Sequence, residues 1–429
     1  MAAVSGTAGG MRTSFLICDA GGVPTSDATD LPDFPLDSGP HGSPSPTWAA
    51  LRAAGPVARL RAPSGTELHV ATGYDDVEFV HRALSRRAAI EAGAEFVVGD
   101  NFNAGTSLTT MDPPEHTRLR GVIGAAFAPR RVAAWEPMVR RSAEDVVAAM
   151  RTGAQAGDLV DVFCLELPVR VICALLGVAR EEIPQFRRWT GAVIASTGMP
   201  PAERLALIEE FRAHITALVA ARVADPGSGL VGDLIRARAD SAGDRLSEPE
   251  LVGLVMALII GGHETTSTVL ARGTLTLLRH PEALAELRAD RTLWPGAVEE
   301  ILRYDSTSTG GMPRGTAEET VLPSGARLPA GAAVIGQLAA ANFDPERFAD
   351  PERFDIHRAD HRHLSFGQGP HFCVGAPLAR MELRIGFPAL FEAFPDLRLT
   401  IPAEELEWST GTRVRALRRL PVAWGPRRR

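Results

Sequence analysis

A single cysteine near the end of the chain lies in a stretch that could hold a charged sulfur. Residues 363–377 read HLSFGQGPHFCVGAP and include Cys373. A thiolate in a loop needs hydrogen-bond donors, and glycines let backbone N–H groups turn towards one sulfur atom. The stretch offers three such glycines, Gly367, Gly369 and Gly375. These residues favour a thiolate that ligates a metal ion, with a buried free cysteine in a glycine-rich turn as the alternative.

The residues beside Cys373 would also stabilise and protect a thiolate. An apolar, helix-like run starts at about Ala376, and Pro377 suits a first helical turn. The positive end of a helix dipole favours an anion close to it. Phe366 and Phe372 could keep water and oxidants away from the sulfur. The stretch taken alone leaves both the metal ligand and the buried thiol open.

A second group of reactive residues interrupts a long apolar run. Residues 261–266 read GGHETT inside a segment, Leu251 to Arg279, that predicts a helix of roughly 40 Å or more. Two glycines weaken a helix, and a buried acid such as Glu264 lowers its stability further. We interpret this point as a functional opening in the helix. The alternative is a tight helix crossing, with Thr265 bonding back to a backbone carbonyl.

Two pairs of side chains could bind an anion or lock the fold. His116 and Arg120 are four residues apart, so they share one face of a helix that opens after a proline-rich start. Glu300 and Arg303 are three residues apart and could form an ion pair. Each pair, taken in isolation, would ordinarily be interpreted as two polar side chains on a solvated surface.

The elements that would position these groups are mostly helical. Ser247 and Glu250 form a capping box before the long helix, whose residues 251–260 are apolar on every side and should cross the molecular interior. Small hairpins are expected around residues 59–70 and 408–424. Further helices are expected over residues 74–84, 130–150, 165–176, 181–189 and 202–224, and from residue 294 onward.

Composition limits the class of protein. The chain has 429 residues, of which 45% are hydrophobic and 23% charged, as in ordinary globular proteins. A net charge of −7 gives no indication of nucleic-acid binding. The four cysteines lack zinc spacing, and the apolar run Phe15 to Cys18 is too short for a signal sequence or a membrane anchor. We therefore expect a soluble, cytoplasmic protein without nucleic-acid or membrane partners.

The stretch around Cys373 resembles the haem-ligand signature of the cytochrome P-450 family. The matching residues are Phe366-Gly367-x-Gly369-x-His371-x-Cys373-x-Gly375, followed by Leu378-Ala379-Arg380-x-Glu382. Residues 261–265 are similar to the family's oxygen-activation motif, small-Gly-x-acid-Thr. Residues 111–120 are similar to the helix that clamps the haem propionates. The motifs follow the family's order across residues 111–382, and the resemblance covers nearly everything after the first 46 residues.

The resemblance implies a mainly α-helical protein with small β-sheets, the cytochrome P-450 fold. Residues 47–429 would form a single catalytic domain that encloses haem b, and residues 1–46 would be a disordered N-terminal arm. Cys373 would ligate the haem iron through its thiolate, which donates electron density to the iron.

The same resemblance assigns the catalytic residues. Thr265 would hydrogen-bond dioxygen, and Glu264 would help to deliver protons close to the buried iron. Gly261 and Gly262 would leave room for oxygen and substrate above the haem.

Roles in holding the haem are also implied. His116 and Arg120 would bind one propionate, and Arg314, helped by His371, would bind the other. Two further residues would contact the cofactor, Phe366 and Gly375. A buried set of three would lock the core behind the haem and help to retain it, namely Glu300, Arg303 and Arg353.

The implied activity is that of a monooxygenase that hydroxylates or epoxidises a small, mostly hydrophobic substrate of secondary metabolism, which could be tethered to a carrier protein. Dioxygen would be the co-substrate, and electrons would come from a ferredoxin and its NAD(P)H-dependent reductase. Four arginines flank the ligand loop and predict a docking face for an acidic ferredoxin, Arg118, Arg130, Arg131 and Arg362. A peroxide-driven peroxygenase and a non-catalytic haem-binding sensor are the alternatives.

Overall fold

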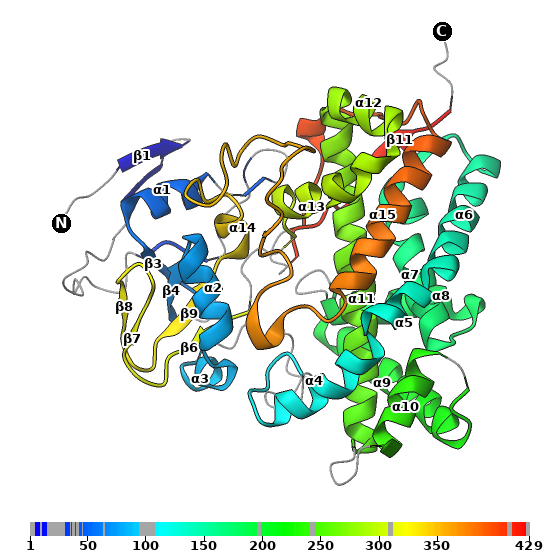
Figure 1. Cartoon of the computed structure of the whole chain (residues 1–429), viewed down its shortest axis with the longest axis horizontal. Coiled ribbons are helices and arrows are strands. Elements are labelled where there is room, and N and C mark those ends of the chain that lie inside the picture. Colours follow the sequence, from blue (N-terminus) through cyan, green and yellow to red (C-terminus); the bar gives the residue numbers. More distant parts are fainter. Residues whose placement is uncertain are drawn as a thin grey trace. The chain divides into compact units, whose positions relative to one another are not determined.

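The computed structural model describes residues 5–8, 11–14, 31–34, 36, 39, 43–44, 46–62, 65–93, 108–194, 199–227, 229–240, 246–307, 312–409 and 414–425. The chain divides into two compact units. What we call the sheet unit comprises Met1–Val97, Leu302–Phe354 and Ala359–Cys373. What we call the helical unit comprises Val98–Ile301, Asp355–Arg358 and Val374–Arg429. Figure 1 labels many of their helices and strands.

A four-stranded sheet forms the centre of the sheet unit. Its strands run in the order β3 (Val57–Arg61), β4 (Glu67–Ala71), β9 (Ala333–Gly336) and β6 (Arg314–Gly315). β3 and β4 pair as the antiparallel hairpin predicted around residues 59–70, and β4 pairs with β9 in parallel. The unit also contains α1 (Thr47–Ala54), α2 (Tyr74–Ala83), α3 (Arg86–Glu91), α14 (Leu338–Ala341) and a ladder of β7 (Thr320–Val321) with β8 (Arg327–Leu328).

The segment before residue 47 is only partly described. Strands β1 (Ser5–Ala8) and β2 (Met11–Ser14) pair antiparallel. Leu31 and Phe34 are buried, and the Phe34 N–H donates to the carbonyl of Arg61 at 2.7 Å. Ordered packing therefore begins before the boundary predicted at residue 46. Much of the predicted arm lies outside the described residues, and its disorder stays a prediction.

The helical unit holds most of the described helices. They are α4 (Glu115–Ala126), α5 (Pro129–Ala134), α6 (Glu136–Thr152), α7 (Glu166–Leu176), α8 (Ile183–Ile194), α9 (Pro201–Ala224), α10 (Leu230–Asp240), α11 (Glu248–Arg279), α12 (Pro281–Ala289), the first part of α13 (Trp294–Tyr304) and α15 (Ala376–Ala393). A small sheet of β10 (Arg398–Leu399), β11 (Pro421–Ala423) and β5 (Ala156–Asp158) completes the unit. The prediction of a mainly helical protein with small sheets is confirmed.

α11 is the long helix predicted from the apolar run. The predicted capping box is present: the Ser247 N–H donates to Glu250 Oε2 at 2.7 Å, and Ser247 Oγ accepts from the Glu250 N–H at 3.3 Å. Its 32 residues make it, among the described helices, the one long and apolar enough to cross a membrane. In the most apolar 18-residue window, 61% of the residues are buried inside the protein, as in a core helix.

Two predicted elements differ in detail. The helix expected over residues 130–150 is two helices, α5 and α6, because Pro137 lacks the N–H that would continue the helical bonding across Trp135. The hairpin expected over residues 408–424 is present at Trp408 and Leu417, which form an antiparallel bridge. β11 instead pairs with β10 and β5, and the expected turn at residues 411–412 lies outside the described residues.

Candidate active site

The loop that carries Cys373 is shaped by two of its three glycines. Gly367 and Gly369 have φ values of 71° and 72°, in the left-handed region that glycine tolerates best. Gly369 also lies so close to α2 that an added Cβ would meet the Cα of Arg82 at 2.6 Å. Gly375 has a φ of −80° and is the N-cap of α15, so its place in the loop does not require a left-handed backbone.

Hydrogen bonds within the loop hold the cysteine in position. The N–H of Cys373 donates to the carbonyl of Phe366 at 2.9 Å, and the N–H of Phe372 donates to that of Gly369 at 3.0 Å. Cys373 is half-buried, and the ring of Phe372 lies 6.4 Å from that of Phe366. Both rings precede the cysteine in the chain, and Phe372, which is 37% exposed, shelters it only in part.

Buried basic residues lie near this loop in the sheet unit. Arg314 on β6 is 2% exposed, and Arg86 donates to the carbonyl of Pro313. His81 on α2 is buried with Nε2 at 3.1 Å from the carbonyl of Gly336. Burial, followed by the charge of Arg314, lowers the pKa of His81 to about 3, so the ring is neutral. The sequence did not indicate His81 and Arg86, because no spacing motif links α2 to β6.

The predicted pair on α4 lies in the helical unit. His116 is 2% exposed and Arg120 is half-buried, four residues apart on the same helix. The side chain of His116 therefore does not lie on a solvated surface.

The donor set fits a haem. Three of the predicted propionate ligands are basic residues that are buried or half-buried: His116, Arg314 and His371. Basic groups of this kind suit carboxylates, and the cysteine loop offers one sulfur ligand. These groups have the chemistry that a haem requires.

Gly261 and Gly262 of α11 have different surroundings, and the helix continues through both without a break. An added Cβ on Gly261 would meet nothing within 4 Å, whereas one on Gly262 would meet Ile172 Cδ1 on α7 at 3.2 Å. Gly261 and Thr265 are both exposed, one turn apart, and Thr265 Oγ1 donates to the Gly261 carbonyl at 2.8 Å. The predicted opening is therefore an exposed face of α11 at Gly261 and Thr265, and the helix itself is not interrupted. The alternative was a tight helix crossing with Thr265 bonded back to a carbonyl. It describes Gly262, which packs against α7, and the hydrogen bond of Thr265.

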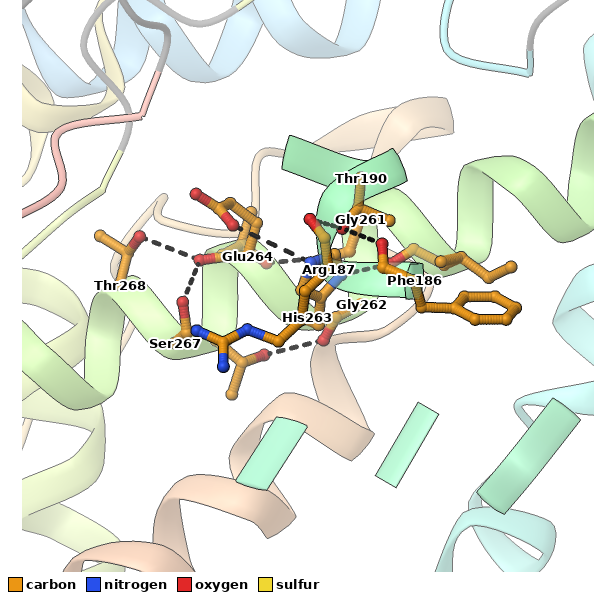
Figure 2. Close-up of polar contacts among 12 residues, drawn as sticks. Phe186, Arg187, Thr190, Gly261, Gly262, His263, Glu264, Ser267 and Thr268 are labelled. Carbon is orange, nitrogen blue, oxygen red and sulfur yellow. Dashed lines mark hydrogen bonds and ion pairs between the residues drawn. The ribbon is translucent and has the colours of Figure 1, made fainter. Parts of the chain in front are cut away.

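Glu264 lies among polar groups of its own helix and of α8 (Figure 2). Burial raises its pKa above the ordinary value, and the charge of Arg187 on α8 opposes that rise. Arg187 Nη2 also donates to Asp161 Oδ1 at 2.7 Å. His263 is buried, with its Nε2 3.9 Å from Glu264 Oε2 and its Nδ1 2.8 Å from the Ile259 carbonyl. The sequence did not indicate Arg187, because only the packing of α8 near α11 brings it to Glu264.

The structural set predicted behind the haem has a different third member. Glu300 is 1% exposed, and its carboxylate accepts from the Asp355 N–H at 2.9 Å and from Arg358 Nε at 3.1 Å. Arg358 therefore takes the place assigned to Arg353, whose side chain is exposed.

Arg303 donates to three backbone carbonyls of the sheet unit. Its guanidinium donates to the carbonyls of Asn342 and Pro351, both at 2.8 Å, and to that of Arg353 at 3.3 Å. Arg353 thus contributes a backbone carbonyl to this set. The error arose because the two arginines are five residues apart and the sequence does not show which one turns inward.

Comparison with known proteins shows the family of the chain. A family model described as cytochrome P450 matches residues 207–405. Cytochrome P450 monooxygenase PikC of Streptomyces venezuelae is 39% identical over 393 residues, covering 89% of this chain and 91% of the relative. The mycinamicin IV hydroxylase/epoxidase of Micromonospora griseorubida is 37% identical over 385 residues, covering 88% and 94%. The crystal structure of the LnmA cytochrome P450 hydroxylase of Streptomyces atroolivaceus matches with a TM-score of 0.83 and 36% identity, over 92% of this chain and 100% of that one.

The fold is mainly helical and carries a glycine-rich cysteine loop and an acid–alcohol pair on α11. These features together are typical of the class of haem-thiolate proteins. With the relatives above, the chain belongs to the cytochrome P450 family. It is a monooxygenase, as predicted, and membership of the family implies a haem cofactor.

Proposed function

We propose that the chain binds haem b through Cys373 and uses it to insert one atom of dioxygen into a bulky, mostly hydrophobic substrate. The observation that carries the proposal is the loop itself, in which Gly367 and Gly369 turn the backbone and the Cys373 N–H is fixed to Phe366. When bound, haem supplies an iron centre for oxygen activation, and a thiolate ligand favours cleavage of the O–O bond.

The chain's own residues would hold the cofactor. His116 and Arg120 would bind one propionate, and Arg314 with His371 the other, because buried basic groups suit carboxylates. Phe366 and Gly375 would contact the haem beside the sulfur. Residues 47–429 would then act as one haem-enclosing domain, with Glu300, Arg303 and Arg358 keeping its core closed.

Proton delivery would depend on α11. The raised pKa of Glu264 lets its carboxyl hold a proton, and Arg187 favours the carboxylate. Thr265 Oγ1 could pass a proton onward after its hydroxyl turns away from the Gly261 carbonyl, since a hydroxyl donates one hydrogen bond and accepts two. Gly261 keeps the face beside Thr265 open, because its missing side chain would point into free space.

The substrate class is inferred from relatives. These relatives include a mycinamicin IV hydroxylase/epoxidase, a 6-deoxyerythronolide B hydroxylase and a vitamin D(3) 25-hydroxylase. We infer that this chain hydroxylates or epoxidises a secondary metabolite of comparable apolar character, free or tethered to a carrier protein.

A ferredoxin and its NAD(P)H-dependent reductase are the proposed electron donors, acting in the cytoplasm. Arg130 is exposed and has no ion pair among the described residues. Two other arginines of the proposed docking face are paired, Arg118 with Glu250 and Arg131 with Asp233. Arg362 is paired with Asp360. Arg130 therefore offers the least compensated charge to an acidic partner.

Two measurements test the proposal. Reduced protein treated with carbon monoxide should give the absorption band of sulfur-ligated haem, and Cys373→Ser should lose it. Conversion of a substrate selected by its shift of the haem spectrum is then compared with ferredoxin, reductase and NAD(P)H, with peroxide alone, and with neither. Conversion by peroxide alone would indicate a peroxygenase, and no conversion under any condition would favour a sensor.

A further inference from the structure

A groove on the helical unit lies apart from the residues assigned above. It runs between α6 and α15, which pack against each other (Figure 1), and it encloses about 800 Å³. Its end is closed by the start of α13 and the turn before it. This volume is within the range of sites for small organic ligands. We call it the α6–α15 groove.

Four arginines from three elements line the α6–α15 groove: Arg140 and Arg151 on α6, Arg291 before α13, and Arg384 on α15. Two glutamates also line it, Glu144 and Glu392. Three of the arginines have a carboxylate partner; these pairs are Arg140 with Glu136, Arg291 with Glu392 and Arg384 with Glu299. Arg151 has no ion pair within the described part of the chain and is exposed at the rim.

One wall carries a buried hydrogen-bond donor. Trp294 lines the groove and is only 3% exposed, and its buried indole N–H has no acceptor among the described residues. Its ring stacks on that of Phe387, with centroids 6.2 Å apart and planes 7° apart, so it is held firmly. Buried donors are nearly always satisfied in native proteins, by protein, water or ligand. The N–H is therefore a donor that a ligand of the groove can use.

α15 contributes an apolar surface and a proline within the helix. Pro388 lies inside α15 and lines the groove. Because proline has no N–H, the carbonyl of Arg384 receives no helical hydrogen bond from it. Small side chains leave the space open; the examples are Ala143, Ala148 and Ala389. The groove thus combines cationic edges with an apolar floor.

We propose that the α6–α15 groove binds a small organic anion, a carboxylate or a phosphate attached to an apolar body. The guanidinium groups of Arg151 and Arg384 attract the acid, the indole N–H of Trp294 donates to it, and the floor beside Ala148 and Pro388 takes the apolar body. The site is independent of the haem and of the proposed reaction, since it uses none of their residues.

Phenyl phosphate is the probe, titrated by calorimetry into the full-length holoprotein, with benzoate as the carboxylate and benzylamine as the cationic control. We expect saturable binding of both anions and none of the amine. Ala148→Trp should fill the groove and weaken binding at least tenfold. The matched control is Ala149→Trp, which places the same ring on the exposed neighbouring position outside the groove. Arg151→Glu should also weaken binding, whereas Arg141→Glu, exposed on the same helix but outside the groove, should not.

The indole N–H gives a second readout. In protein labelled with ¹⁵N-indole tryptophan, the resonance absent from Trp294→Phe belongs to Trp294, and phenyl phosphate should shift it in proportion to occupancy. The proposal is overturned if this resonance does not move, if Ala148→Trp binds as tightly as Ala149→Trp, or if binding moves the haem absorption band equally in both. In the last case the probe occupies the haem pocket.

Discussion

The hydroxyl of Thr265 donates a hydrogen bond to the carbonyl of Gly261, one turn earlier on α11, at 2.8 Å. Both residues lie on an exposed strip of a helix that is otherwise largely buried. This bond orients the hydroxyl oxygen and keeps its lone pairs free to accept. This geometry suits a hydroxyl that accepts a proton and then donates one to the next group.

Replacing Thr265 with alanine should uncouple the enzyme. The substitution removes the hydroxyl and preserves the helix, because alanine is the best helix former. Haem and substrate binding should persist, whereas most electrons from NAD(P)H should end in peroxide. The ratio of product to NAD(P)H consumed measures this, with Thr265→Ser as the variant that restores a hydroxyl. An unchanged ratio in Thr265→Ala would show that the assigned role is wrong.

Arg187 should set the pH range in which Glu264 holds a proton. Burial raises the pKa of Glu264 and Arg187 opposes the rise, so Arg187→Gln should raise that pKa further. The carboxyl would then stay protonated to higher pH, and the alkaline limb of the pH profile of coupled turnover should move upward. Arg188→Gln, on the exposed next position of α8, should leave the profile in place. A shift of the limb in the acid direction would contradict this assignment.

Arg358, not Arg353, should be the arginine on which Glu300 depends. Arg358→Ala would leave the carboxylate of Glu300 buried without its cation, and breaking a buried pair typically destabilises by about 3–5 kcal/mol. Arg353→Ala should have a small effect, since its carbonyl, which remains, is the group that accepts from Arg303. Thermal unfolding and haem retention of the two variants, compared side by side, decide between them. Equal losses would restore the role predicted for Arg353.

The sequence predicted those parts of the molecule that local patterns determine. The apolar run and Ser247–Glu250 predicted the start of α11, and the spacing of glycines around Cys373 predicted a turned loop. Both signals arise from residues within one turn or one loop of each other. For the same reason, family motifs built from short spacings identified His116 and Arg314 as candidates.

The parts that the sequence did not predict depend on distant packing. Arg187 reaches the surroundings of Glu264 only because α8 packs near α11, and His81 lies by Arg314 only because α2 packs against the central sheet. No periodicity encodes such pairs. The choice of Arg358 over Arg353 likewise depends on how the chain turns after Pro351.

Arg130 should contribute to docking of the ferredoxin. It is exposed and without an ion pair among the described residues, so Arg130→Glu should slow the first electron transfer and weaken its dependence on salt. Stopped-flow reduction at two ionic strengths gives both quantities. Arg279→Glu, at the exposed end of α11, serves as the control for a change in net charge alone. Identical rates for the wild type and Arg130→Glu would exclude Arg130 from the docking face.

Glu382 should make the stability of the protein fall as pH rises. It is 1% exposed on α15, its Oε2 has no hydrogen-bond partner among the described residues, and burial raises its pKa well above the ordinary value of 4.5. Above pH 4.5 the unfolded chain loses this proton while the folded protein keeps it. The free energy of unfolding therefore decreases with pH, by at most about 1.4 kcal/mol per unit for one proton, until the folded carboxyl ionises.

Glu382→Gln tests this linkage, because glutamine has nearly the same shape and cannot ionise. The variant should match the wild type near pH 4 and exceed it increasingly between pH 5 and 8, as measured by denaturant unfolding at each pH. Glu203→Gln, at an exposed position on α9, should give a constant difference over the same range. A wild-type stability that rises with pH relative to Glu382→Gln would mean that the folded protein holds Glu382 as a carboxylate. A cationic partner would then have to compensate for its burial.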